Sequence, residues 1–308
     1  MSSSVKESSD KGSSVKEKGK GSSVKERGKE RKMGSLFAGF GGVVWGIIPI
    51  LLIVVGGLIY SGGIRGGNVL SADISKPLDG ATSAKVDVDA DSGNLTIDSL
   101  AAEQVLASGT LQYFENQGAP VQAVSSSGGQ ATLTLKGGGN GLPSIRLPWS
   151  ACVGAYEWQI HLNPAVASDV TAHSGGGNVK LDLAGMALTR LSADTGGGNV
   201  DVVLPDSAAN LSVLARTGGG NVSVEIGSGT TGTSAVDASS GAGNVVVDIP
   251  TGVAARIHTS TGLGKAIVDP RYSAIDRDTY QSSDFDGAAN RVEITAKSGA
   301  GNVVVNAR

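Results

Sequence analysis

The stretch Ser174-Gly-Gly-Gly-Asn-Val179 recurs, nearly unchanged, through the second half of the chain. The later copies are Thr195-Gly-Gly-Gly-Asn-Val200, Thr217-Gly-Gly-Gly-Asn-Val222, Ser240-Gly-Ala-Gly-Asn-Val245, Thr261-Gly-Leu-Gly-Lys-Ala266 and Ser298-Gly-Ala-Gly-Asn-Val303. The motif asparagines are Asn178, Asn199, Asn221, Asn244 and Asn302, and Lys265 takes their place once. Successive positions differ by 21, 22, 23 and 21 residues, then by 37 across an insertion. A near-constant period of this length predicts a solenoid.

Each motif leads into a segment in which apolar and polar residues alternate. In the first copy, Val179, Leu181 and Leu183 lie on one side of the expected strand, and Lys180 and Asp182 on the other. A second short apolar segment precedes each glycine run. Each coil therefore reads as strand, glycine corner, strand and return loop. We predict an all-β fold, a parallel β-solenoid with coils of about 21–23 residues and inward rows of Val, Leu and Ile as its core.

The glycine runs themselves are predicted to be structural corners. Glycine and asparagine tolerate positive φ better than other residues, so we expect the corners to use that conformation. Identical asparagines at stacked corners can also form a hydrogen-bonded ladder. A phosphate-binding loop occurs once and opens a helix, whereas these runs recur and lead into strands, which argues against nucleotide binding.

The N-terminal residues differ in composition from the repeats. Residues 1–32 contain three copies of Ser-Ser-Val-Lys-Glu, with ten basic and five acidic residues, and we expect a disordered tail. Residues 33–64 carry no charge, and their apolar part, residues 36–60, is long enough to cross a bilayer as one helix. Residues 65–80 read as a linker and 81–308 as the solenoid. A cleaved signal peptide is the alternative for the apolar segment.

The charges that flank the apolar segment predict its orientation. The basic tail precedes it, and only Arg65 follows closely. The positive-inside bias then places the N-terminus in the cytoplasm and the C-terminal domain outside a cell membrane that the chain crosses once.

Composition limits the functional classes. The 308 residues include 47 glycines and only 12 aromatic residues, which argues against a conventional enzyme core. Cys152 is the only cysteine, so neither an internal disulfide framework nor a cysteine-based metal site can form. The three histidines lack zinc-site spacing. We expect no catalytic residues and no nucleic-acid partner, and keep a glycan-active enzyme on a β-helix as a minor alternative.

One candidate site follows the repeat. The position four residues after the corner asparagine is often acidic, and it supplies Asp98, Asp182, Glu225, Asp248 and Asp269. Stacked carboxylates could hold Ca²⁺, which prefers oxygen ligands. The alternative is a solvated face whose charges are balanced by neighbours such as Lys180.

Three further candidates lie where the repeat is interrupted. Trp149, Tyr156 and Trp158, in the interruption over 142–164, could stack on sugars or form a hydrophobic plug. Tyr272 and Tyr280, in the insertion over 270–291, could bind a partner or cover one face of the coils. The last strand, 303–305, has no cap after it in the sequence, so an open edge could support self-association, unless the insertion covers it.

The motifs resemble those of a bacterial family. The Ser/Thr-Gly-x-Gly-Asn-Val-x-Val runs over 174–303, the segment 147–164 and the apolar segment 45–57 are similar to the DUF4097-type and toast-rack, LiaF-like proteins. The resemblance implies a β-solenoid without catalytic residues. It also implies adhesion to a surface glycan or envelope protein, or, alternatively, regulation in envelope-stress sensing.

Overall fold

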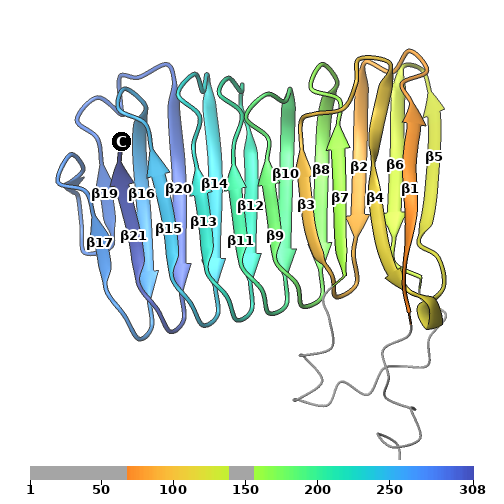
Figure 1. Cartoon of the computed structure of the whole chain (residues 1–308). Helices are drawn as coiled ribbons and strands as arrows, with labels where there is room; N and C mark the ends of the chain where they lie inside the picture. The colour runs from red at the N-terminus through yellow and green to blue at the C-terminus, as the bar shows by residue number, and fades with distance from the viewer. Residues whose placement is uncertain (1–67, 139–155) are drawn as a thin grey trace, which may run out of the picture. The chain divides into compact units, whose positions relative to one another are not determined.

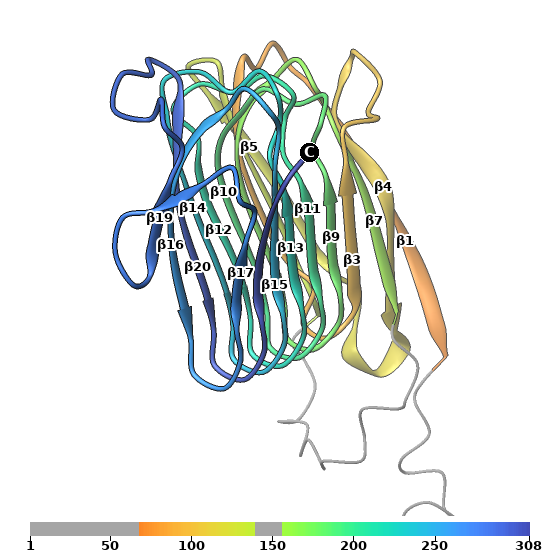
Figure 2. The same cartoon turned by 90° about the vertical axis from the view of Figure 1, so that its left-hand side faces the viewer.

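The computed structural model describes residues 68–138 and 156–308, which belong to one compact unit. The predicted tail and membrane segment lie outside the described residues, as does Trp149. Among the described residues, no helix has the length and apolar character needed to cross a membrane. The described unit is all-β and consists of two large, mostly parallel sheets that face each other (Figures 1 and 2).

Sheet A has ten strands. In spatial order they are β1 (Val69–Pro77), β4 (Val105–Phe114), β7 (Glu157–Leu162), β3 (Asn94–Asp98), β9 (Val179–Asp182), β11 (Val200–Val203), β13 (Val222–Glu225), β15 (Val245–Ile249), β21 (Val303–Ala307) and β17 (Ala266–Val268). A short 3-10 helix, η1 (Glu115–Gln117), follows β4.

Sheet B has eleven strands. In spatial order they are β18 (Ser273–Ala274), β19 (Thr279–Gln281), β16 (Ala254–Thr261), β20 (Arg291–Ser298), β14 (Thr233–Ser240), β12 (Ser212–Thr217), β10 (Leu188–Thr195), β8 (Ala167–Ser174), β2 (Ser83–Asp89), β6 (Gln130–Lys136) and β5 (Val121–Ser127). The chain alternates between the sheets from β8 to β17, so each repeat forms one coil with a strand in each sheet.

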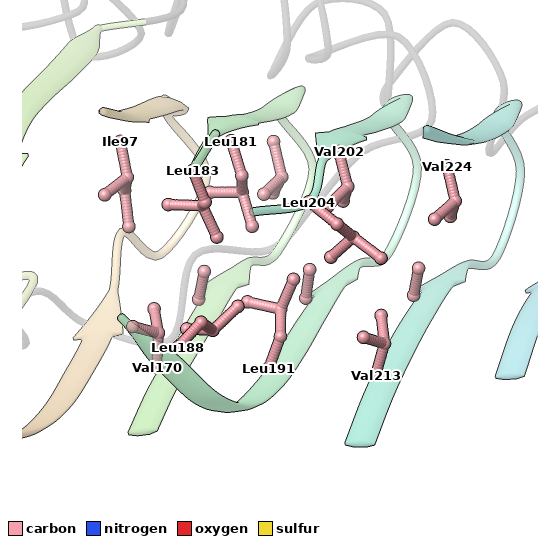
Figure 3. Packing of buried hydrophobic residues seen from close by; sticks show 14 of the residues in the cluster. Ile97, Val170, Leu181, Leu183, Leu188, Leu191, Val202, Leu204, Val213 and Val224 are labelled. Carbon is pink, nitrogen blue, oxygen red and sulfur yellow. The ribbon is translucent and has the colours of Figure 1, made fainter. Parts of the chain in front are cut away.

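The core lies between the sheets, as the alternating sequence predicts. In β9, Val179 and Leu181 are buried and Lys180 and Asp182 are exposed. Figure 3 shows the two facing apolar layers, one carried by sheet A and the other by sheet B. The labelled residues include Ile97, Leu181, Val202 and Val224 on one side and Val170, Leu191 and Val213 on the other. One coil could not bury its apolar face alone, so the coils stabilise each other.

The corner asparagines form a ladder through the stack. The side-chain oxygen of Asn94 accepts the main-chain N–H of Asn178, and that of Asn178 accepts the N–H of Asn199, each at 2.9 Å. The same bond then links Asn199 to Asn221, Asn221 to Asn244, Asn244 to Asn302 and Asn302 to Lys265. Lys265 has no side-chain acceptor, so the ladder ends there.

A second ladder, which the sequence reading did not anticipate, runs on the inner side of the corners. The buried hydroxyl of Thr217 donates to the carbonyl oxygen of Gly198 at 2.7 Å and accepts the N–H of Gly220. Equivalent bonds join Ser174 to Gly93, Thr195 to Gly177, Ser240 to Gly220 and Ser298 to Gly243. Serine or threonine therefore begins these five corners, where its hydroxyl bonds to the neighbouring coil. In the terminal coil, Thr261 instead donates to the carbonyl oxygen of Gly264 in its own corner at 3.4 Å.

The expectation of positive φ at the corners is wrong. No residue of the six repeated motifs has a φ in the left-handed region. Asp91, at the less regular corner before Asn94, has a φ of 55°, and the glycines with such a φ lie elsewhere, such as Gly232 and Gly252. Glycine is needed because neighbouring corners touch: a Cβ on Gly220 would overlap the carbonyl oxygen of Gly198. The middle position has more room, and it is there that alanine or leucine replaces glycine, as in Ala242 and Leu263.

The order of coils at the C-terminal end also differs from the sequence order. The coil of β20 and β21 lies between the coil of β14 and β15 and the coil of β16 and β17. The expectation that residues 303–305 form an open edge is therefore wrong, because β21 has a partner on both sides. The open strand of sheet A at this end is β17.

The N-terminal end has the same arrangement. The coil of β2 and β3 lies inside that of β6 and β7, although it comes first in the sequence. The antiparallel strands β1, β4 and β5 extend the sheets beyond it. Part of the linker expected over 65–80 is thus β1, because its residues pair with β4 along their whole length.

Candidate functional site

The outer face of sheet B combines charged side chains with small ones. Because neighbouring strands are in register, outward residues form rows across the sheet. One row contains Arg190 and Ser212, then Ala235 and Glu293; the next contains Ser192, Leu214, Asp237 and Thr295. The centre of the face, over β12 and β14, therefore combines Ser212 and Ala235 with the larger Leu214 and the charged Asp237.

Two adjoining shallow depressions, of about 550 and 460 Å³, lie on this face. Both are lined by Leu214, and we call them together the β12 groove. The smaller one is lined by uncharged residues and by charged ones: Ser192, Ser212, Leu214 and Ala235, and also Arg190, Asp237 and Glu293. The larger one extends toward the corners and contains Asp194, Arg216, Ser239 and the backbone of Gly218 and Gly241.

Ion pairs between neighbouring strands border the β12 groove. Arg216 lies 3.4 Å from Asp237, and Arg190 lies 3.8 Å from Asp169. His173 Nδ1 lies 2.5 Å from an Asp194 oxygen. These side chains are about two-fifths exposed or more, and exposed pairs contribute only about 0–1 kcal/mol each to stability. Their main effect is to place polar and charged groups around Leu214 and the small residues of the groove.

The acidic positions on sheet A do lie in a row, and several of them have a polar or charged partner. Asp98 and Asp182 are neighbours, and Asp98 lies 2.6 Å from His161 Nδ1. Glu225 forms an ion pair with Arg308. Asp248 accepts a hydrogen bond from Asn306 at 2.7 Å. In the part of the chain that the structure describes, no three His, Cys, Asp or Glu side chains are grouped closely enough to hold a metal ion. Calcium binding by this column stays a prediction.

Asp269 stands apart from the other acidic positions. The β21 strand separates β17 from β15, so Asn306 comes between Asp248 and the terminal coil that carries Asp269. Asp269 instead accepts the main-chain N–H of Arg271 at 2.9 Å.

Tyr156 and Trp158 belong to the core, so they are not an exposed site for sugars. Trp158 is fully buried, and its ring N–H donates to the carbonyl oxygen of Gln112 at 2.9 Å. Tyr156 is 3% exposed, packs edge-on against Phe114 and donates to the carbonyl oxygen of Ala90 at 2.8 Å. Burial raises the pKa of the Tyr156 phenol. Both rings fill the end of the stack, as a hydrophobic plug would.

The insertion over 270–291 covers the edge of sheet B. Its strands β18 and β19 form a hairpin that pairs antiparallel with β16. Tyr272 is 4% exposed, burial raises its pKa, and Tyr280 packs partly buried against the core. Phe285 is also buried, with the Arg256 guanidinium 4.3 Å from its ring centre. The tyrosines therefore attach a cap, and do not form an exposed patch.

The β12 groove was missed by sequence reasoning. Its lining residues carry no motif, and they come from positions 22 or 23 residues apart on successive strands. Glu293 and Thr295 join it only because β20 lies beside β14. The one available signal was that small residues, Ser192, Ser212 and Ala235, occur at outward positions of three successive strands.

Comparisons with known proteins agree with this architecture. A crystal structure of a "putative cell adhesion protein" from Clostridium sporogenes matches 78% of this chain and 100% of its own, at 19% identity and a TM-score of 0.58. A "putative adhesin" from Bacteroides fragilis matches 78% of this chain and 97% of its own, at 13% identity and a TM-score of 0.34. The first shares the fold, whereas the TM-score of the second is too low to support an argument. No curated protein matches significantly.

The sequence itself carries the stronger evidence of kinship. The model of the N-terminal domain of toast_rack, DUF2154, matches residues 65–225, which span β1 through β13. That range contains the N-terminal coils, in which β2 and β3 lie inside β6 and β7, and the first three Gly-Gly-Gly-Asn corners. The chain therefore belongs to the toast-rack family.

Proposed function

We propose that this protein is a surface interaction scaffold that adheres to a polar surface of a cell or its envelope through the β12 groove. The observation that carries the proposal is the groove itself, an open depression lined by Leu214, small polar residues and charged side chains of both signs. The similarity to a structure described as a cell adhesion protein supports it by analogy.

The β12 groove suits the binding of an extended ligand. Rows of outward side chains repeat at the strand spacing, about 4.8 Å, so a polymer or a protein surface can contact several strands at once. Leu214 supplies an apolar contact, and Ser192 and Ser212 supply hydroxyls that can donate or accept. The bordering charges would fix the orientation of the ligand more than they would raise its affinity.

A binding role fits this site better than catalysis. The carboxylates Asp194 and Asp237 are about two-fifths exposed, and each lies against His173 or Arg216 from a neighbouring strand. A general acid or base of an enzyme is usually withdrawn from solvent, unlike these two groups. We infer that the protein is not an enzyme.

Membrane attachment is part of the proposal. The uncharged residues 33–64 are long enough for one span, and the basic tail before them favours a cytoplasmic N-terminus. The folded unit begins directly after this segment, at residue 66. The two sheets would then form an extracytoplasmic β-solenoid held at the cell surface.

Filling the β12 groove should abolish adhesion without affecting the fold. Ala235 is exposed on β14 at the floor of the smaller depression. We expect Ala235→Arg and Ala235→Glu each to weaken retention of the full chain on immobilised envelope fragments at least about tenfold, or 1.4 kcal/mol. Both signs of charge should act alike, because the cause is loss of space.

Ser223→Arg is the matched control, since Ser223 points outward from β13 on the opposite sheet. It should leave retention unchanged. Retention that survives both Ala235 variants would rule out the groove as the adhesive site. It would favour the second candidate, envelope-stress regulation, for which the specific observation is the three-copy basic tail over 1–32.

A further inference from the structure

The exposed large apolar side chains of the described residues gather at the two ends of the stack. Val69 and Leu70 on β1 and Val121 and Val124 on β5 lie at the N-terminal end. Leu263, Ile267 and Ile275 belong to the C-terminal end, and only Leu100 lies elsewhere. Ile267, in the middle of β17, is 53% exposed. Exposed apolar side chains that are grouped in this way indicate an interaction surface, whereas singly scattered ones are ordinary.

At the C-terminal end, the two sheets are finished differently. The hairpin of β18 and β19 extends sheet B beyond β16 and pairs with Arg256–His258, in the middle of that strand. Main-chain bonds from Ser282 to Ala255 and from Thr259 to Asp278 lengthen this contact. Sheet A ends at β17, which has β21 as its single partner. Figure 2 shows β17 facing the viewer, with β19 to its left. An uncovered edge strand is a template for pairing with another chain.

The main-chain groups of β17 define which residues could pair. The N–H of Asp269 donates to Val305, and the carbonyl oxygen of Lys265 accepts from Val303, so these residues bond to β21. In a parallel strand the residues between them turn their N–H and C=O groups the opposite way. Ala266 and Val268 therefore present their main-chain groups to the free edge.

The sequence of this edge is complementary to itself. It reads Lys265-Ala-Ile-Val-Asp269, with a basic residue at one end, an acidic one at the other and an apolar residue at the centre. If two copies pair antiparallel about Ile267, Ala266 lies opposite Val268 of the second copy and both can exchange hydrogen bonds. Ile267 then faces its own counterpart, and each Lys265 faces an Asp269 on the same side of the sheet.

We propose that two copies of this chain associate through β17, in an antiparallel, two-fold symmetric pair centred on Ile267. Lys265 favours this closed pair over head-to-tail stacking of more coils. A coil added in parallel would need an asparagine at position 265 to continue the ladder, and lysine offers no acceptor. The row of Val246 and Val304 continues the apolar contact from Ile267 across sheet A.

Symmetric cross-linking tests the proposal directly. Residues opposite each other at a non-hydrogen-bonded antiparallel position have Cα atoms about 4.5 Å apart, which is within the range of a disulfide. In the full chain in detergent, with Cys152→Ser to remove the native thiol, we expect Ile267→Cys to form a disulfide-linked dimer. Leu100→Cys, more exposed at 76% and distant from β17, is the matched control and should give only a background of collisions.

Charge reversal tests the register. In the Ile267→Cys protein, Lys265→Glu alone and Asp269→Lys alone should each lower the cross-linked fraction several-fold, because like charges then face each other. Mixing the two variants should restore it, since every facing pair is again opposite in sign. Cross-linking of Ile267→Cys no greater than that of Leu100→Cys would overturn the proposal. A yield of cross-linked dimer that does not respond to either charge change would overturn this pairing. Neither measurement involves the β12 groove, so the results are independent of adhesion.

Discussion

Replacing Gly220 by alanine is expected to destabilise the protein by about 3 kcal/mol, the upper end of the cost of overpacking. The new Cβ would overlap the carbonyl oxygen of Gly198 in the neighbouring coil. That atom is main chain and cannot rotate away as a side chain could. The coils would have to separate locally, which would also weaken the bond from Thr217 to the same carbonyl group. The midpoint of urea unfolding measures the loss.

Gly219→Ala is the control one residue away. A Cβ on Gly219 would find its nearest neighbours at 3.9 Å or more, an ordinary contact, and Gly219 does not have a positive φ. Alanine there should change stability by less than about 1 kcal/mol, with any gain arising from the unfolded chain. Equal destabilisation by the two substitutions would show that glycine serves flexibility, and not close stacking, at these corners.

The repeat predicted the coil but could not predict the order of the coils. Every corner offers a main-chain N–H at the asparagine position, so the side-chain oxygen of Asn244 could accept equally well from residue 265 or from residue 302. The chain places Asn302 next to Asn244, and Lys265 beyond it. The sequence hints at this in one respect: the copy that lacks asparagine is the copy with no further coil to bond. Identical repeats carry little information about which neighbour each one takes.

The β12 groove shows the same limit for function. Alternation correctly indicated which residues point outward in the strand after a corner, for example Lys180 and Asp182 in β9. It could not indicate that Glu293, from a repeat 58 residues away from Ala235, lies directly beside it. A surface site of this kind depends on side chains that no motif connects, so it emerges only when the strand order is known.

Replacing Trp158 by alanine should be among the most damaging single changes, at about 3–5 kcal/mol. The ring is fully buried, between the strands that join the antiparallel end to the parallel stack, because β7 pairs with β3 on one side and β4 on the other. Its loss would leave a large cavity and an unpaired carbonyl oxygen at Gln112. Thermal unfolding, followed by near-ultraviolet circular dichroism, measures the effect.

Trp158→Phe separates the causes, since it keeps most of the apolar volume and removes only the ring N–H. It should cost less than half as much as the alanine change, because a single hydrogen bond contributes about 1 kcal/mol. Adhesion should fall only as far as the folded fraction falls. A Trp158→Ala protein that unfolds at the normal temperature but no longer binds envelope fragments would contradict the core assignment. It would return this tryptophan to the role of a ligand-stacking residue, which its burial between β3 and β4 argues against.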